Sequence, residues 1–171
     1  MTFLSRIFGD RKERQALRPL YDAAVRVGRE PGWYLEGGVP DTMTGRFDVV
    51  SSVVALVLLR LEREGEAARR ETVLLTELFI DDMDATLRQS GIGDLVVGKR
   101  VGKLMSTLGG RLGAYREALQ GGGDLHAAVR RNVFRDSPPS QDVVPVVAER
   151  LRALHARLGH VSREQMLAGE I

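Results

Sequence analysis

The chain has 171 residues, and its 43% hydrophobic and 28% charged residues are typical of one folded domain. Its 25 Lys and Arg against 23 Asp and Glu leave a formal charge of only +2, so the net charge does not indicate a nucleic-acid or membrane-surface partner. No cysteine is present, which excludes a disulfide framework, a thiolate zinc site, a cysteine-held iron–sulfur cluster and a cysteine nucleophile.

The longest apolar run, residues 49–59, is much shorter than the roughly 20 residues that a membrane-spanning helix needs. The first residues contain no cleavage site of a secretory signal. We therefore expect a cytoplasmic protein without a stable transmembrane anchor. Peripheral association with the cytoplasmic face of the inner membrane is compatible with this location.

The spacing of apolar residues predicts an all-α fold, a single compact domain of six to seven helices. A first helix over 13–27 ends at Gly28. Residues 29–46 are rich in glycine and proline and predict a long ordered loop, which contains the only tryptophan, Trp33. The next helix, 47–64, is apolar on almost every side, as expected for the central core helix.

Four further helices are predicted over residues 66–89, 95–120, 124–134 and 142–158. Asp124 is a candidate N-cap, and Ser162 with Gln165 predicts a capping box before a final short turn. We divide the chain into an N-terminal segment (1–12), a helical domain (13–135) and a helical extension (136–171) that packs on the same domain.

An acidic cluster lies on the third long helix, where Glu77, Asp81, Asp84 and Arg88 share one side. Carboxylates so placed are candidate ligands of a divalent cation, and a hydrolase would use Asp81, Asp82 and Asp84. No second set of acidic ligands is visible, so a solvated face with an Asp84–Arg88 pair is the alternative. A third interpretation is an acidic surface for a basic partner.

Residues 95–135 contain eight Lys or Arg and two acidic residues, a local charge of +6. On the helix that begins this segment, four cations share one side: Lys99, Arg100, Lys103 and Arg111. Such a stripe can face the phosphates of RNA or lipid. The alternative is the solvated face of an amphipathic helix.

The same helix carries a stripe of glycines: Gly98, Gly102, Gly109 and Gly113. Each costs of the order of 0.5–1 kcal/mol relative to alanine. We expect a neighbouring helix to pack closely against this stripe, and the alternative is a docking site for a partner's helix.

Signatures of enzymes are otherwise absent, because no P-loop or dinucleotide motif occurs. The histidines His126, His155 and His160 do not have the spacing of a metal site or a triad. We therefore predict no catalytic, metal-binding or cofactor-binding residue.

A succession of motifs resembles the ubiquinol–cytochrome c chaperone family over roughly residues 13–135, and no counterpart is found after Ser137. The motifs are Trp33-Tyr34, Gly37-Gly38-Val39-Pro40-Asp41-Thr42, Gly45-Arg46-Phe47-Asp48, Leu78-Phe79-Ile80-Asp81-Asp82-Met83-Asp84, Leu87-Arg88, Gly91-Ile92-Gly93-Asp94-Leu95, Val97-Gly98-Lys99, Gly110-Arg111, Tyr115 and Arg131-Asn132-Val133-Phe134. The ordered succession is more specific than any single motif.

The resemblance implies a non-enzymatic bacterial chaperone that binds newly made cytochrome b and supports assembly of the ubiquinol–cytochrome c reductase (bc1) complex. It also implies a place near the ribosome exit tunnel in some members and leaves room for a second assembly factor. The alternative is a ribosome- or nucleic-acid-binding module that uses the basic face of residues 95–135.

We expect the loop from Trp33 to Phe47 to be an ordered lid that forms one wall of the partner-binding surface, with Asp41 and Arg46 at its rim. The candidate partner-binding residues are Trp33, Tyr34, Gly37, Gly38, Val39, Pro40, Asp41, Gly45, Arg46, Asp81, Asp84, Gly93, Asp94, Lys99, Arg100, Lys103 and Arg111.

Overall fold

The computed structural model describes the backbone of residues 3–89 and 97–171 and the side chains of residues 12–89 and 99–171. Its helices are α1 (Phe3–Gly28), α2 (Gly32–Leu35), α3 (Met43–Glu62), the 3-10 helix η1 (Gly65–Ala68), α4 (Arg69–Gln89), α5 (Val97–Gln120), α6 (Leu125–Asn132), α7 (Val143–His160) and α8 (Arg163–Leu167). These residues contain no strand, so the predicted all-α fold is confirmed. Gly93 and Asp94, two candidate partner-binding residues, lie outside the described residues.

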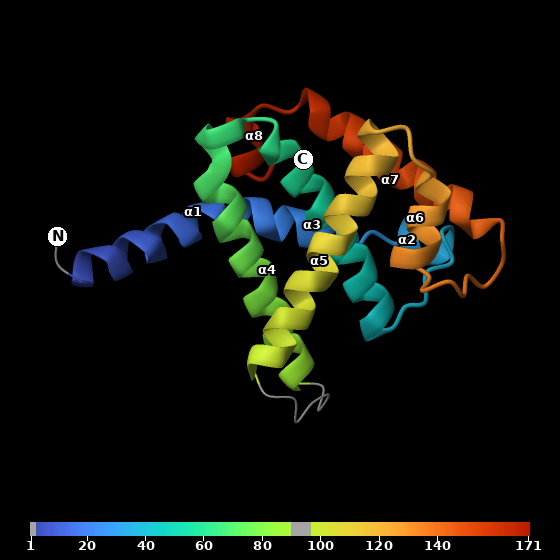
Figure 1. Ribbon diagram of the computed structural model, residues 1–171, viewed down its shortest axis with the longest axis horizontal. Coiled ribbons are helices and arrows are strands. Elements are labelled where there is room, and N and C mark those ends of the chain that lie inside the picture. The colour runs from blue at the N-terminus through green and yellow to red at the C-terminus, as the bar shows by residue number, and fades with distance from the viewer. Residues whose placement is uncertain (1–2, 90–96) are drawn as a thin grey trace.

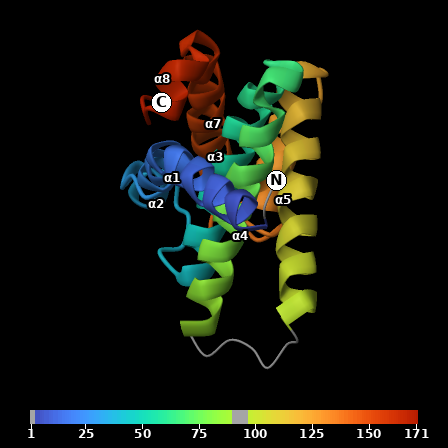
Figure 2. The same ribbon diagram turned by 90° about the vertical axis from the view of Figure 1, so that its left-hand side faces the viewer.

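Helix α3 lies at the centre of the molecule, with α1 on one side and α5 on the other (Figures 1 and 2). Every residue of α3 from Asp48 to Leu61 is buried, because other helices cover each of its faces. The prediction of a central core helix is therefore confirmed. In the described residues, no helix is both long and apolar enough to cross a membrane.

Two helices begin earlier than the sequence analysis predicted. Helix α1 starts at Phe3 and therefore includes residues 3–12 of the predicted N-terminal segment. The helical spacing of Phe3 and Ile7 is the signal that indicates this start. Helix α3 starts at Met43 instead of Phe47, because the Thr42 hydroxyl accepts a hydrogen bond from the Gly45 N–H at 3.1 Å and caps the helix.

The loop between α1 and α3 is held by hydrogen bonds to the end of α1. The buried indole of Trp33 donates to the Val27 carbonyl at 2.7 Å, and the Tyr34 hydroxyl donates to the Gly28 carbonyl at 2.7 Å. Gly45 is required by a close approach, since a Cβ there would lie 2.0 Å from the Pro40 oxygen. The loop is therefore ordered, as expected.

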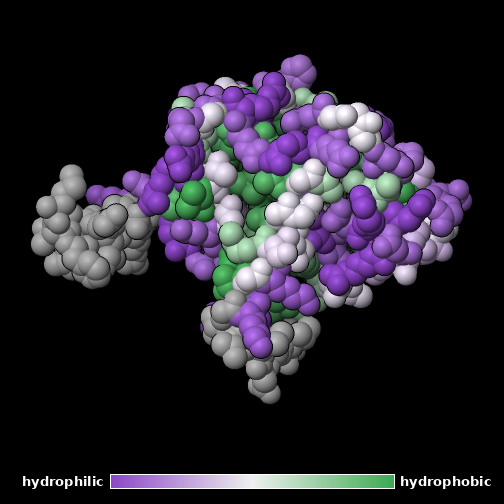
Figure 3. All heavy atoms as spheres, viewed as in Figure 1, coloured by the Kyte–Doolittle hydropathy of each residue, from purple (hydrophilic) through white to green (hydrophobic). Residues whose placement is uncertain are grey.

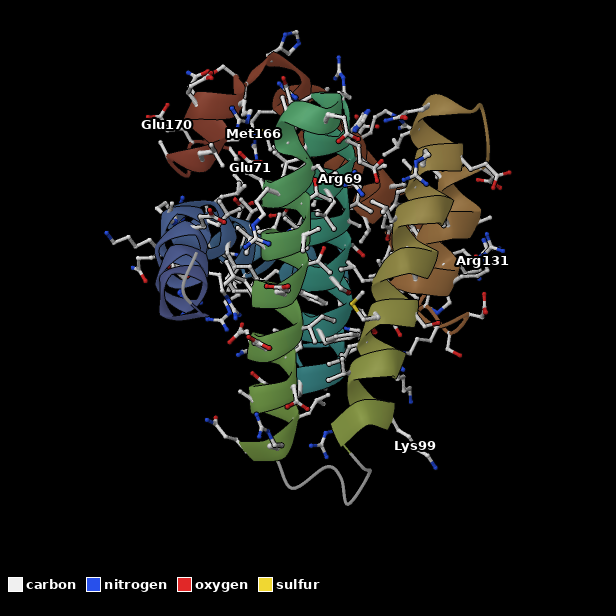
Figure 4. All side chains as sticks on the ribbon, turned by 60° about the vertical axis from the view of Figure 1, so that its left-hand side comes forward. Arg69, Glu71, Lys99, Arg131, Met166 and Glu170 are labelled. Atoms are coloured by element: carbon white, nitrogen blue, oxygen red, sulfur yellow. The ribbon has the colours of Figure 1, made fainter. Side chains whose placement is uncertain are left out.

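The C-terminal helices pack on the same hydrophobic core as the rest of the chain. Leu151 and Leu158 of α7 are fully buried in it, and Met166 places α8 against it (Figure 4). An ion pair between Arg163 and Glu71 joins α8 to α4. The predicted N-cap at Asp124 and the capping box of Ser162 and Gln165 are both present.

The expected close packing against the glycines of α5 is wrong. A Cβ built on Gly102, Gly109 or Gly113 meets no atom within 4 Å, and the surroundings of Gly98 are outside the described side chains. A pale band, the colour of residues with intermediate hydropathy, follows α5 across the surface (Figure 3). Periodicity placed these glycines on one face correctly, but it cannot tell which face of a helix receives a neighbour.

This open face predicts that alanine stabilises the protein. We expect Gly102→Ala, Gly109→Ala and Gly113→Ala each to raise the free energy of unfolding by about 0.5–1 kcal/mol, because alanine orders the unfolded chain and meets no atom in the folded one. Urea denaturation measures the change. Gly37→Ala is the matched control and should destabilise, since its Cβ would lie 2.5 Å from the Trp33 oxygen. A loss of stability in the α5 variants would contradict the open face.

Candidate functional site

Three adjoining clefts run along one side of α3. The first, about 360 Å³, lies among α3, α4, α5 and α6. The second, about 300 Å³, shares Met43, Phe47 and Leu87 with the first. The third, about 290 Å³, shares Arg29, Asp41 and Arg46 with the second. Because neighbouring clefts share walls, they form one continuous surface, which we call the groove.

The middle of the groove is apolar, and its ends are polar. Met43, Phe47 and Leu87 form the wall common to the first two clefts. Leu35 lines the third cleft and is 82% exposed, and Met43 is 40% exposed. Large apolar side chains that remain in water along a connected depression are typical of a surface that receives an apolar partner.

A buried ion-pair network lies beneath the first cleft and is centred on Asp48. Its Oδ1 accepts from Arg111 Nη2 at 2.5 Å, and its Oδ2 accepts from Arg135 Nε at 2.9 Å. The Arg111 guanidinium also donates to the Asn132 carbonyl at 2.7 Å and lies over the Phe47 ring at 5.5 Å. The network therefore joins the start of α3 to α5 and to the end of α6.

Burial has opposite consequences for the two arginines of this network. Arg111 is almost completely buried, and desolvation lowers its pKa despite the attraction of Asp48. The side chain of Arg135 is largely exposed, and its hydrogen bond to Asp48 raises its pKa. Both remain cations at neutral pH, so two positive charges face one carboxylate.

The second buried carboxylate at the groove belongs to Asp84 on α4. It accepts a hydrogen bond from Arg100 Nε at 2.9 Å, and Arg88 contacts its other oxygen at 3.0 Å. Asp84 and Arg100 are both buried. The predicted solvated acidic face is therefore wrong at Asp84, although the expected Asp84–Arg88 pair is present.

The carboxylates of the acidic cluster go to separate partners. Asp81 pairs with Arg14, and Asp82 accepts from the Tyr21 hydroxyl at 2.6 Å. In the side chains that the structure describes, no group of three or more possible metal ligands comes together. Desolvation and the hydrogen bond to Asp82 raise the pKa of Tyr21, so this phenol stays protonated.

The predicted basic stripe on α5 is broken by burial. Arg100 and Arg111 point inward to Asp84 and Asp48, whereas Lys99 and Lys103 are exposed. Figure 4 shows Lys99 projecting from the first turn of α5, away from the bundle. A helical wheel shows on which side of α5 a cation lies, but it cannot show that another helix places a carboxylate beside that cation. The interpretation of these four residues as one exposed stripe was wrong for this reason.

At the other end of the groove, Asp41 and Arg46 pair with each other. Arg46 Nε donates to Asp41 Oδ1 at 2.6 Å, and this hydrogen bond is the main cause of the lowered pKa of Asp41. Both side chains are exposed and line the second and third clefts. Tyr34 lies beside them, and partial burial raises the pKa of its hydroxyl.

The candidate residues from the sequence thus fall into distinct positions. Those that line the groove are Tyr34, Asp41, Arg46, Arg100, Lys103 and Arg111. Those buried in the scaffold behind it are Trp33, Gly37, Val39, Gly45 and Asp84. Gly38 has a φ of 62° and is half-buried, and the remaining exposed candidates are Pro40, Asp81 and Lys99.

The list of candidate residues omitted five that build the groove: Met43, Phe47, Asp48, Arg131 and Arg135. Met43 and Phe47 lie in the loop that was expected to form a wall, and Arg131 and Arg135 lie in the basic segment 95–135. A signal existed for Asp48, because an acidic residue at the edge of an all-apolar helix requires a cationic partner. No sequence signal identifies which cation meets it, since Arg111 and Arg135 come from distant parts of the chain.

Comparisons with known proteins agree with this fold. The family model described as ubiquinol–cytochrome C chaperone matches residues 35–171, which includes the C-terminal stretch for which the motifs had given no counterpart. A crystal structure of the Cbp3 homolog from Brucella abortus is similar, with a TM-score of 0.80 and 29% sequence identity over 99% of this chain and 95% of that one. No curated protein matches the sequence. Because the family model covers most of the chain, this protein is a member of the ubiquinol–cytochrome c chaperone family.

Proposed function

We propose that this protein is a non-enzymatic assembly chaperone that holds newly made cytochrome b for the ubiquinol–cytochrome c reductase complex. The family supports the assembly role. The observation that carries the finer proposal is the groove, which combines an apolar middle with exposed Leu35 and Met43. A membrane-protein client presents apolar segments before insertion, and a holder needs a surface of this kind.

The groove can be tested with substitutions that leave the core unchanged. We expect Leu35→Ser combined with Met43→Ser to reduce co-purification of cytochrome b from detergent-solubilised membranes by about tenfold, because two exposed apolar contacts are lost. The melting temperature should hardly change. Quantitative mass spectrometry of a tagged pull-down from the host measures the client.

Val146→Ser is the matched control for this experiment. Val146 is a large apolar residue on α7, 37% exposed, and it does not line any of the three clefts. It should leave the client's yield unchanged. Equal yields from the groove variant and the wild type would argue against the groove as the client site. Unchanged haem b spectra after deletion of the gene would argue against the assembly role itself.

The alternative, a ribosome- or nucleic-acid-binding module, receives less support from the geometry. Its basic face comprised residues 95–135, and two of the four cations in the predicted stripe, Arg100 and Arg111, are buried in ion pairs. Arg116 is also paired, with Glu62 at 2.7 Å. Charge reversal at Lys99 and Lys103 tests this alternative. Salt-dependent co-sedimentation of the wild type with ribosomes that the variant loses would support it.

A further inference from the structure

In the part of the chain that the structure describes, cationic side chains outnumber carboxylates at the first cleft of the groove. Five of the described residues that line it are cationic, Arg100, Lys103, Arg111, Arg131 and Arg135, and none of them is acidic. The carboxylates beneath it are Asp48 and Asp84, whose side chains are only 2% and 8% exposed. Among the described side chains, Arg100 pairs with Asp84, and Arg111 and Arg135 share Asp48, which leaves Lys103 and Arg131 without a carboxylate.

We propose that this cleft is a carboxylate-binding site, which receives an acidic side chain carried by an apolar segment of the client. The inference rests on the proposed function, because it specifies which part of a client the first cleft accepts. Arginine and lysine form their strongest hydrogen bonds with carboxylates in partly desolvated surroundings of this kind.

Two of the five cations are available for such a ligand. Lys103 on α5 and Arg131 on α6 are exposed, and neither has a carboxylate partner among the described side chains. They come from two different helices that line the cleft, α5 and α6, and Figure 4 shows Arg131 on α6. A carboxylate between them would be contacted from two helices.

The deeper arginine is also incompletely paired. Arg111 Nε is buried and has no hydrogen-bond partner, although Nη2 of the same side chain contacts Asp48 and Asn132. An unpaired buried N–H of a charged group is costly in a folded protein. A second carboxylate in the cleft would add negative charge close to this guanidinium.

The backbone is strained where it brings the fifth cation to the cleft. Arg135 and Asp136 have φ angles of 51° and 62°, a region that residues with a Cβ rarely adopt. The Asp136 N–H donates to the Arg130 carbonyl at 2.9 Å and holds this turn after α6. The turn brings the exposed Arg135 guanidinium within hydrogen-bond distance of the buried Asp48 carboxylate. The strained backbone of the turn thus keeps a cation at the cleft.

The apolar half of the cleft favours a peptide segment over a lipid phosphate. Met43, Phe47 and Leu87 lead from the cations into the second cleft, and Leu35 lies further along the groove. A segment laid along this path can place apolar side chains and one carboxylate at separate positions. An acidic residue of a membrane segment needs a paired cation wherever water is excluded, and this cleft supplies one.

The test uses two blocked synthetic peptides of alanine, leucine and serine that differ only by a central Glu or Gln. We expect the wild-type protein to bind the Glu peptide about tenfold more tightly by isothermal titration calorimetry at low salt, the effect of one charge-assisted contact. In the variant Lys103→Gln with Arg131→Gln, this preference should disappear while the affinity for the Gln peptide stays the same.

Lys12→Gln with Arg157→Gln removes the same charge from exposed positions outside the groove and should keep the tenfold preference.

Equal binding of the two peptides to the wild type would overturn the carboxylate site and leave the apolar groove intact. A preference that survives in Lys103→Gln with Arg131→Gln would overturn it as well. A third result would also overturn the carboxylate site: the wild type binds both peptides equally and binds phosphatidylglycerol vesicles, and Lys103→Gln with Arg131→Gln abolishes the vesicle binding. This result would assign the cleft to a lipid phosphate. If Leu35→Ser with Met43→Ser retains cytochrome b while the Glu preference stands, the cleft binds carboxylates but the groove is not the site that holds cytochrome b.

Discussion

Asp48→Ala should lower the free energy of unfolding by about 3–5 kcal/mol, the range measured when one member of a buried ion pair is removed. The side chain of Asp48 is 2% exposed and is the carboxylate on which Arg111 and Arg135 converge. Without it, Arg111 stays buried with no anion, and both arginines repel each other. Guanidinium denaturation followed by far-ultraviolet circular dichroism measures the loss.

Two further variants separate this effect from a general loss of surface charge. Glu62→Ala breaks the half-exposed pair with Arg116 and should cost less than about 1 kcal/mol. Asp48→Leu combined with Arg111→Met removes the buried charges together and should recover at least about 2 kcal/mol relative to Asp48→Ala. If Asp48→Ala and Glu62→Ala were equally mild, the network would not be a buried one.

Trp33→Ala should destabilise the protein by about 3–5 kcal/mol, as truncation of a large core aromatic does. The indole is 2% exposed, donates to the Val27 carbonyl at 2.7 Å, and has the Arg150 guanidinium 5.7 Å from its ring. Its removal leaves a cavity beneath the loop and removes one of the two hydrogen bonds that the Val27 carbonyl accepts, the other being from the Glu30 N–H. Urea denaturation of the full chain gives the value.

The neighbouring residue Leu35 provides the control, because it is 82% exposed on the same short helix. Leu35→Ala should change the stability by less than about 0.5 kcal/mol. Trp33→Phe should fall between the two, since it keeps most of the apolar volume and loses the N–H donor. A tryptophan that could be truncated without loss would mean that the loop is not anchored through α2.

Local signals in the sequence carried the fold. The apolar residues of α3 between Val49 and Leu61 predicted a helix surrounded by others, and the structure buries all of them. The caps at Asp124 and Ser162 could be predicted, because a capping side chain accepts hydrogen bonds from N–H groups that lie within three positions of it. The start of α1 was predicted too late, because the apolar pattern of its first residues is short.

The candidate site was only partly accessible to the same reasoning. Asp41 and Arg46 were expected at the rim of the loop, free to pair with each other or with a partner, and they pair with each other five positions apart in the chain. Arg100, Arg111 and Asp84 were expected on exposed faces, either solvated or facing a partner. They are instead buried in ion pairs between helices. Their partners lie 16 and 63 positions away, so only the packing of α3, α4 and α5 decides that they meet.

The sequence alone determined the helical class, the central helix, the caps and, through a succession of motifs, the family. These depend on residues close together in the chain, whose spacing reports local geometry directly. The tertiary structure decided which cations are buried, that the glycines of α5 face open space, and that Met43, Phe47 and Leu87 join separate clefts into one groove. Burial and ion pairing depend on segments that are distant in the chain and meet only in the folded protein. Hydrophobic packing brings these segments together, and the positions of the polar residues that it buries follow no periodic pattern in the sequence.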